Sequence, residues 1–220
     1  MTKRLIFGLL VFLLSFSLAA SLALAGEKAK ENIPFFGLGV SRGEKVPGWS
    51  PNSLWGNRDQ YGWQSQSAHL LYGWRMSKYN DRWRVWFEGE VGSISFGRGI
   101  EYDLRTADIL VKTSYDFLRF KDVNLHFMTL EKIDIFAQVG GGIGWGDKKF
   151  PDEKLLGRNP HGIFTCGLGV SIPLGENFYA ETTFDFYHRS SFPDSKDKGL
   201  NGEISCIKIV KYFDKFSDLF

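Results

Sequence analysis

The sequence has few cysteines, little net charge and, beyond its first 25 residues, no long apolar run. Two cysteines among 220 residues exclude a scaffold held together by several disulfide bonds. No later stretch approaches the ~20 consecutive apolar residues that a membrane-spanning helix needs. The 27 basic and 25 acidic residues nearly cancel, which argues against a general nucleic-acid binder. If the chain resides in a membrane, it must therefore cross as a closed barrel of strands.

The N-terminal segment is typical of a secretory signal peptide. Lys3 and Arg4 precede an apolar run over 5–18, and the small residues of 23–25 supply a cleavage site before Gly26. An uncleaved anchor is the alternative, which the short apolar run and the alanine-rich exit disfavour. Removing the signal subtracts two basic residues (27 − 2 = 25), so the remaining chain has equal numbers of both charges. We expect a signal peptide over 1–25 and one exported domain over 26–220.

Apolar and polar residues alternate in about eight segments of the remaining chain. Period-two alternation indicates strands, and the 25 glycines and 35 aromatic residues (20 Phe, 8 Tyr, 7 Trp) suit strands joined by tight turns. The connections alternate between long and short, with 42–66 and 96–105 as loops. The segment 117–132 is either a long turn or an extension of the strands beside it. The expected strands cover 36–41, 68–76, 83–91, 107–116, 133–139, 164–172, 178–190 and 203–213.

The face opposite the apolar one carries charges of both signs. Its members are Arg75, Arg84, Glu88, Glu90, Asp108, Lys112, Asp116, Asp134, Glu181 and Asp185. A soluble barrel turns its apolar face inward, and a lipocalin-type cavity lined by these charges would be a poor apolar pocket. Apolar outside and polar inside is typical of outer-membrane barrels with short periplasmic turns and long outer loops. We predict an all-β, eight-stranded antiparallel transmembrane barrel in the outer membrane of a Gram-negative cell.

The strand 178–190 ends in a histidine and a serine on its apolar face. Successive strand side chains point to opposite faces, so His188 and Ser190 share the face of Phe186 at the outer end. Glu203 opens the last strand and lies an even number of residues from the apolar residues of that strand's outer face, so it is expected on the lipid-facing side. A hydroxyl becomes a strong nucleophile when a neighbouring base takes its proton, and that base needs an orienting acid. The alternative without chemistry is an interfacial histidine beside a surface serine and glutamate.

The run 186–191, Phe-Tyr-His-Arg-Ser-Ser, with Asn201-Gly202-Glu203 after the next loop, resembles the lipid A 3-O-deacylase (PagL-like) family. Members of that family are eight-stranded outer-membrane barrels with a His-x-Ser-Asn motif late in the chain. The resemblance covers the whole exported chain in architecture, and only 186–203 in specific motif. It implies that Ser190 is the nucleophile, His188 the general base and Glu203 the orienting acid. It also implies cleavage of the 3-linked acyl ester of lipid A.

One residue departs from the family pattern. The asparagine that follows the serine in the family, and helps to form the oxyanion hole, is Ser191 here. Losing one oxyanion donor costs about 10²–10³ in rate. The oxyanion candidate that takes its place is the Ser191 hydroxyl, and a backbone N–H is the alternative. Asp194 and Asp197 in the preceding loop are alternatives to Glu203 as the acid.

Three hypotheses about function remain open. The first is an esterase that removes an acyl chain from lipid A of lipopolysaccharide, with the 3-O position as the expected site. The second is a non-catalytic small barrel, an adhesin or structural protein. The third is an outer-membrane phospholipase, as in outer membrane phospholipase A, which also works at a lipid-facing Ser-His pair. Expected partners are lipopolysaccharide and outer-membrane lipids, with no nucleic acid, and a monomer is expected. Basic residues expected in loops suit lipid phosphates: Arg42, Lys45, Arg58, Arg98, Arg105, Lys148, Lys149 and Arg158.

No cofactor and no metal ion are expected. The glycine cluster of 140–146 is not followed by the amphipathic helix that a phosphate-binding loop requires. His69, His126 and His161 fall in separate elements without cysteine or aspartate at ligand spacing. The remaining nucleophiles of interest are the two thiols. Cys166 and Cys206 have parities that place them on opposite sides of the sheet, so we expect both to be free.

Overall fold

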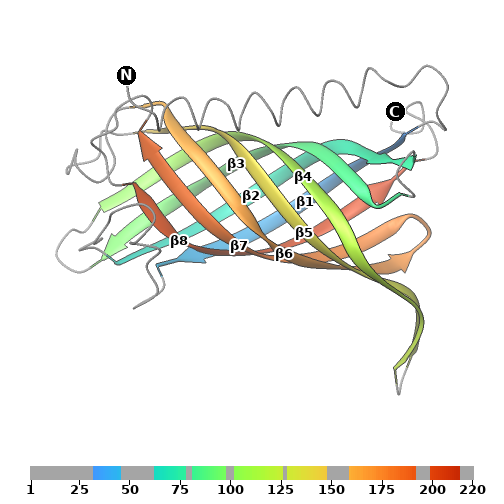
Figure 1. Ribbon diagram of the computed structural model, residues 1–220. Coiled ribbons are helices and arrows are strands. Elements are labelled where there is room, and N and C mark those ends of the chain that lie inside the picture. The colour runs from blue at the N-terminus through green and yellow to red at the C-terminus, as the bar shows by residue number, and fades with distance from the viewer. Residues whose placement is uncertain are drawn as a thin grey trace.

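The computed structural model describes residues 32–45, 62–77, 81–97, 102–125, 128–147, 159–191 and 199–213. These residues form eight antiparallel strands that follow one another around a closed barrel, with β1 hydrogen-bonded to β8 (Figure 1). The eight-stranded antiparallel barrel predicted from the alternation is confirmed. Residues 1–25, the expected signal peptide, lie outside the described residues. The strands are β1 (Ile33–Glu44), β2 (Gly62–Met76), β3 (Trp83–Gly97), β4 (Tyr102–Leu125), β5 (Met128–Gly146), β6 (His161–Gly175), β7 (Phe178–Ser191) and β8 (Leu200–Tyr212).

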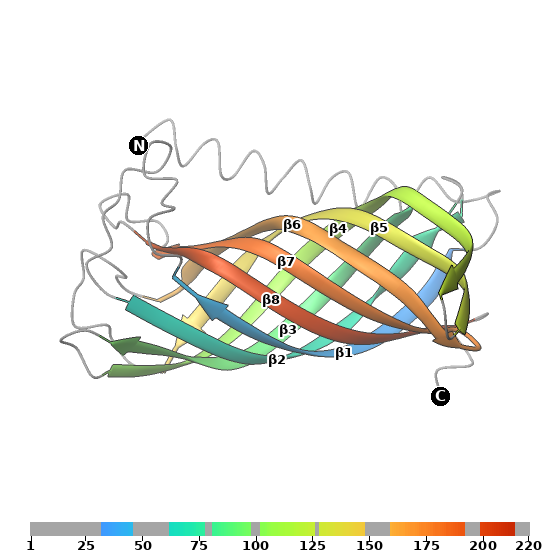
Figure 2. The same cartoon turned by 90° about the horizontal axis from the view of Figure 1, so that it is seen from below.

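In the described part of the chain, no helix has the length and apolar character to span a bilayer. The strands run obliquely around the barrel (Figure 2). Following paired residues from Val40 through β2, β3 and β4 leads to Trp145 on β5. Following them through β8, β7 and β6 leads to Ile135. This offset of ten residues (145 − 135 = 10) is the stagger of a tilted barrel, so Val40 is level with a point on β5 near Gly140.

Apolar side chains face outward over the middle of the strands. Examples that are more than half exposed are Leu38, Val40, Leu70, Val91, Ile109, Leu168, Phe184 and Ile207. All ten charged residues expected on the other face are buried inside the barrel. The inverted arrangement, apolar outside and charged inside, is therefore confirmed for this part of the barrel. It is the arrangement that a lipid environment requires.

The charges inside the barrel are paired with one another. In the middle, the Glu88 carboxylate accepts hydrogen bonds from Lys112 Nζ (2.8 Å), Lys208 Nζ (3.2 Å) and Trp86 Nε1 (2.9 Å). The same carboxylate lies 2.8 Å from His69 Nδ1. Because a buried charge without a partner is very costly, this network fixes the pairing of the strands that supply it.

Two further networks lie on either side of this one, one toward each end of the barrel. Arg84 bridges Glu181 and Asp116, the latter at 3.3 Å. Arg189 donates to both carboxylate oxygens of Asp108, at 2.7 and 3.0 Å. Each network ties strands that are far apart in the sequence, so the interior is a packed set of ion pairs.

The interior is not polar from end to end, and this corrects the expectation. One apolar cluster lies inside the end where β2 begins: Trp63, Ile94, Phe96, Leu104, Leu110, Ile163, Tyr187, Leu200 and Ile204. A second contains Phe35, Leu71, Trp86, Val210 and Tyr212. Residues 62–66 and 102–105, expected in loops, are strand, and only 98–101 separate β3 from β4. In these residues the apolar side chains point inward and the polar side chains point outward, which is the reverse of the pattern in lipid-facing strands. A search for apolar residues on the outer face therefore does not identify them as strand.

The segment 117–132 extends the strands beside it. β4 continues to Leu125 and β5 begins at Met128, with a bulge between Asp116 and Leu118. Figure 1 shows this hairpin projecting past its neighbours. It lies at the end of the barrel at which β1 begins, opposite the end at which β1 finishes.

Candidate active site at the outer rim

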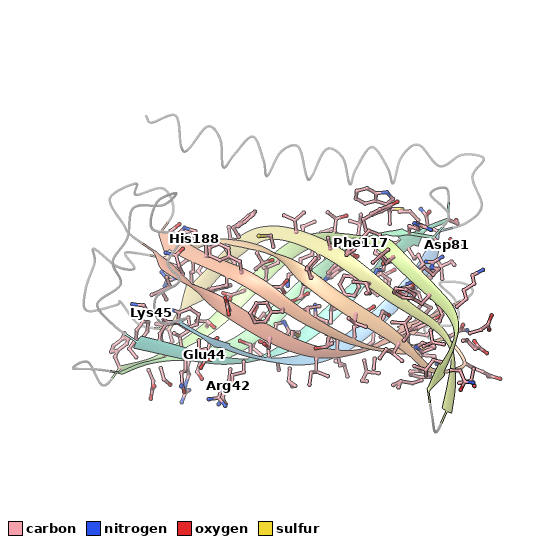
Figure 3. All side chains as sticks on the ribbon, turned by 60° about the horizontal axis from the view of Figure 1, so that its bottom comes forward. Arg42, Glu44, Lys45, Asp81, Phe117 and His188 are labelled. Atoms are coloured by element: carbon pink, nitrogen blue, oxygen red, sulfur yellow. The ribbon has the colours of Figure 1, made fainter. Side chains whose placement is uncertain are left out.

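The histidine and serine of β7 lie on the outward face near one end of the barrel. Their neighbours Tyr187 and Arg189 are buried inside, at 3% and 0% exposure, so His188 and Ser190 point outward, as their parity indicates. Figure 3 shows His188 at the end that carries the last residues of β1, far from Asp81. This is the end at which β1, β3, β5 and β7 finish and β2, β4, β6 and β8 begin.

His188 makes a short hydrogen bond to the neighbouring strand. Its Nδ1 lies 2.7 Å from the side-chain oxygen of Asn201, the residue directly opposite it on β8. An amide oxygen only accepts hydrogen bonds, so Nδ1 is the donor in this contact. In the neutral imidazole Nε2 then carries the lone pair. The tautomer is the one that a general base needs when it takes a proton from a hydroxyl.

Gly199 lies against both residues. Its φ of 72° falls in the left-handed region that favours glycine. A Cβ at this position would come within 2.7 Å of His188 Cε1 and 3.2 Å of Ser190 Cβ. The backbone before β8 therefore approaches the pair as closely as a residue without a side chain allows, and holds both in place.

Glu203 lies one step further along the same face. It is opposite Phe186, two residues from Asn201, and is half-buried. Diagonal neighbours of this kind are about 7–8 Å apart, within reach of long side chains. His188 Nδ1 is hydrogen-bonded to Asn201, and Glu203 as the orienting acid stays a prediction.

Three other predicted positions fall outside what the structure describes. Ser191, the oxyanion candidate, ends β7, but its side chain is not among the described residues. Asp194 and Asp197 lie in 192–198, between β7 and the described start of β8. Their roles therefore stay predictions.

Sequence reasoning missed Asn201. The signal was present, since Asn201 has the parity of Glu203 and the last two strands were expected to pair. What was lacking was the register, because it depends on where the loop after Ser191 ends. Once His188 is opposite Asn201, their side chains must lie on one face.

A cluster that could ligate a metal occurs inside the barrel. Ligand atoms of His69, Glu88 and Glu90 lie within 4.8 Å of one another. The Glu88 carboxylate is already engaged by two lysine ammonium groups, and His69 Nε2 is 2.7 Å from Ser41 Oγ. A cation would have to displace these partners, so we assign the cluster to the buried ion network.

Comparison with known proteins places the fold in a class. Outer membrane protein OprG from Pseudomonas aeruginosa is similar, with a TM-score of 0.50 and 8% identity over 84% of this chain and 98% of that chain. Two structures of Ail, the attachment invasion locus protein of Yersinia pestis, have TM-scores of 0.42 and 0.37 and identities of 12% and 11%. Each covers 83% of this chain and nearly all of Ail, 100% and 99%. The chain has the eight-stranded barrel fold of small outer-membrane proteins.

Sequence comparison adds no family to this class. No protein-family model matches the chain, and no curated protein matches it. The resemblance to lipid A 3-O-deacylases therefore rests on the motif within 186–203. At 8% identity, the likeness to OprG shows the fold alone.

Proposed function

We propose that this barrel resides in the outer membrane and hydrolyses an acyl ester of a lipid, with Ser190 as nucleophile and His188 as general base. The observation that supports this most is the 2.7 Å hydrogen bond from His188 Nδ1 to Asn201, on the outward face that also carries Ser190. It holds the imidazole in the tautomer that can activate a hydroxyl. The proposed substrate, suggested by the motif, is an ester-linked acyl chain of lipid A, at the 3-O position.

The reaction proceeds by acyl transfer to the serine. Ser190 Oγ attacks the ester carbonyl while its proton passes to His188 Nε2. The imidazolium then returns the proton to the departing alcohol oxygen as the tetrahedral intermediate breaks. A water molecule repeats the sequence on the acyl-serine, releasing the fatty acid and restoring Ser190.

Asn201 orients the imidazole without a charge. A carboxylate would also stabilise the imidazolium that forms in the transition state, and a neutral amide does this less well. Glu203 lies one step away on the same face. We propose that Asn201 positions His188 and that the Glu203 carboxylate supplies that charge from a longer distance.

The location of the pair suits a lipid substrate. An outward-facing site at the rim receives a molecule from the membrane or its surface, and not through the barrel, whose interior is occupied by ion pairs and apolar clusters. Exposed Arg42 and Arg105 near the same end suit the phosphates of lipopolysaccharide.

Mass spectrometry of lipid A from cells with and without the protein tests this function. We expect loss of one hydroxyacyl chain with the wild type, and intact lipid A with Ser190→Ala or His188→Ala. Ser93→Ala, an outward serine on β3 away from the site, is the matched control and should behave as the wild type. An unchanged mass of lipid A and of phospholipids in cells that carry a folded wild-type barrel would refute the proposal.

A non-catalytic barrel is the second candidate. The comparisons favour it, because OprG is a small outer-membrane barrel and no protein-family model assigns an enzymatic class to the chain. Ser191 in place of the family asparagine also favours it, since a missing oxyanion donor costs about 10²–10³ in rate. A phospholipase would use the same pair on a different ester, and lipid analysis separates it from a lipid A deacylase.

A further inference from the structure

The outward apolar surface of β8 is unusually short. Ser205 and Lys211 are exposed polar residues, and only Ile207 and Ile209 face outward between them. Six residues of strand cover about 20 Å at ~3.3 Å per residue. At a tilt near 45° that is about 14 Å of membrane depth. An outer-membrane barrel normally presents an apolar band of about 25 Å.

The far wall has no such shortage. On β5 the outward residues between Glu131 and Asp147 are Ile133, Ile135, Ala137, Val139, Gly141, Ile143 and Trp145. Sixteen residues (147 − 131 = 16) at the same rise and tilt span about 37 Å of depth. Tilting the whole barrel cannot lengthen the stretch on β8, so the membrane must differ between the two walls.

Four polar residues limit the apolar surface on this side, and we call them the polar wedge. They are Arg42 and Glu44 on β1 and Glu203 and Ser205 on β8, directly opposite one another in two pairs. In the described part of the chain, no ion pair involves Arg42, Glu44 or Glu203. Figure 3 places Arg42 and Glu44 at the end of the barrel that carries His188.

The polar wedge reaches a level at which the far wall is apolar. Ser205 is opposite Arg42, the first outward residue beyond Val40, and Val40 is level with the middle of β5 near Gly140. Arg42 is two residues further out and is therefore level with β5 near residue 142, where the outward residue Ile143 is 42% exposed and apolar. Charged side chains without partners are costly in hydrocarbon. Water or polar lipid groups must therefore reach Arg42 and Ser205 at a depth where Ile143 contacts acyl chains.

We propose that the outer leaflet is locally thinned over the polar wedge, and that this thinning brings the ester of a lipid substrate to Ser190. A bilayer accommodates a short apolar span by thinning. Asn201 is the next outward residue after Glu203, and His188 lies opposite Asn201, so the site borders the polar wedge. The delivery of the ester rests on the proposed function; the thinning does not.

Spin labels on the two walls test the thinning. A nitroxide is placed at Ser205→Cys or Ile143→Cys in a Cys166→Ser/Cys206→Ser background, with the protein in bilayers. We expect the label at 205 to be relaxed mainly by a water-soluble nickel chelate, and the label at 143 mainly by oxygen. Equal depth at both positions would overturn the proposal. So would spin–spin broadening with exclusion of the chelate at 205, which would indicate that a second copy covers the polar wedge.

Lipid hydrolysis tests the delivery of the ester. Arg42→Leu/Ser205→Leu extends the apolar surface, and we expect about a tenfold fall in hydrolysis of bilayer lipid. Activity on the same lipid dispersed in detergent should not change, and Ser93→Leu on β3 should match the wild type in both assays. An equal fall in detergent, or no fall in bilayers, would overturn the delivery. If the wild type hydrolyses no lipid, the proposed function fails, and the spin labels alone decide whether the leaflet is thinned.

Discussion

Substitution of Asn201 by alanine separates the two residues that could orient His188. The hydrogen bond between them is 2.7 Å long and becomes charge-assisted when the imidazolium forms. Hydrogen bonds to charged groups contribute about 1.5–3 kcal/mol, and each ~1.36 kcal/mol is tenfold in rate. We therefore expect kcat for lipid hydrolysis to fall about tenfold to a hundredfold in Asn201→Ala, with little change in KM, because the bond strengthens only in the transition state.

Glu203→Gln is the matched variant, because it keeps the shape of the side chain and removes its charge. Glu203 does not share the hydrogen bond of His188, so we expect less than about a twofold fall in kcat, as for a partly exposed charge. Both variants should retain a barrel that shifts in gel mobility on boiling. A large fall in Glu203→Gln with an unchanged Asn201→Ala would refute this reasoning and assign the orienting role to the carboxylate.

Three further predictions concern the barrel. Glu88→Ala leaves two buried lysine ammonium groups without their carboxylate, so unfolding in urea should show a loss of about 3–5 kcal/mol, whereas exposed Glu131→Ala should show almost none. Gel mobility should be the same with and without reductant. A membrane-permeant apolar thiol reagent should modify the half-buried, outward-facing Cys166 in the folded barrel, and Cys206, which is 2% exposed, only after unfolding. The protein should fractionate with the outer membrane and begin at Gly26, and recovery as a soluble periplasmic protein would contradict the barrel's location.

The closed barrel could be predicted from the sequence because lipid and interior impose opposite demands on neighbouring residues. Charged residues such as Glu88 and Lys112 alternate with exposed apolar ones, and this fixed the direction of each face. The same rule failed for Trp63 and Leu104, whose strands pass beyond the apolar band and reverse the pattern. Free thiols at Cys166 and Cys206 were also predicted correctly from parity.

The site could be predicted only in part. Parity within β7 places His188 and Ser190 on one face whatever the register of the neighbouring strand. The partner of His188 depends on that register, and hence on where the chain re-enters the barrel after the loop. A shift of two residues in the pairing of β7 with β8 would place Glu203 opposite His188 in place of Asn201. The motif resemblance favoured the carboxylate, whereas the paired strands bring the amide to the imidazole.

Covalent labelling of the purified barrel tests the central claim most directly, because it needs no knowledge of the natural substrate. An alkyl sulfonyl fluoride reacts with a serine that a neighbouring base has activated. Intact-mass and peptide analysis should show one adduct, on Ser190, which is absent in Ser190→Ala and strongly reduced in His188→Ala. A folded wild-type barrel with no adduct on Ser190, or with equal labelling in His188→Ala, would contradict the assignment of this pair as an esterase site.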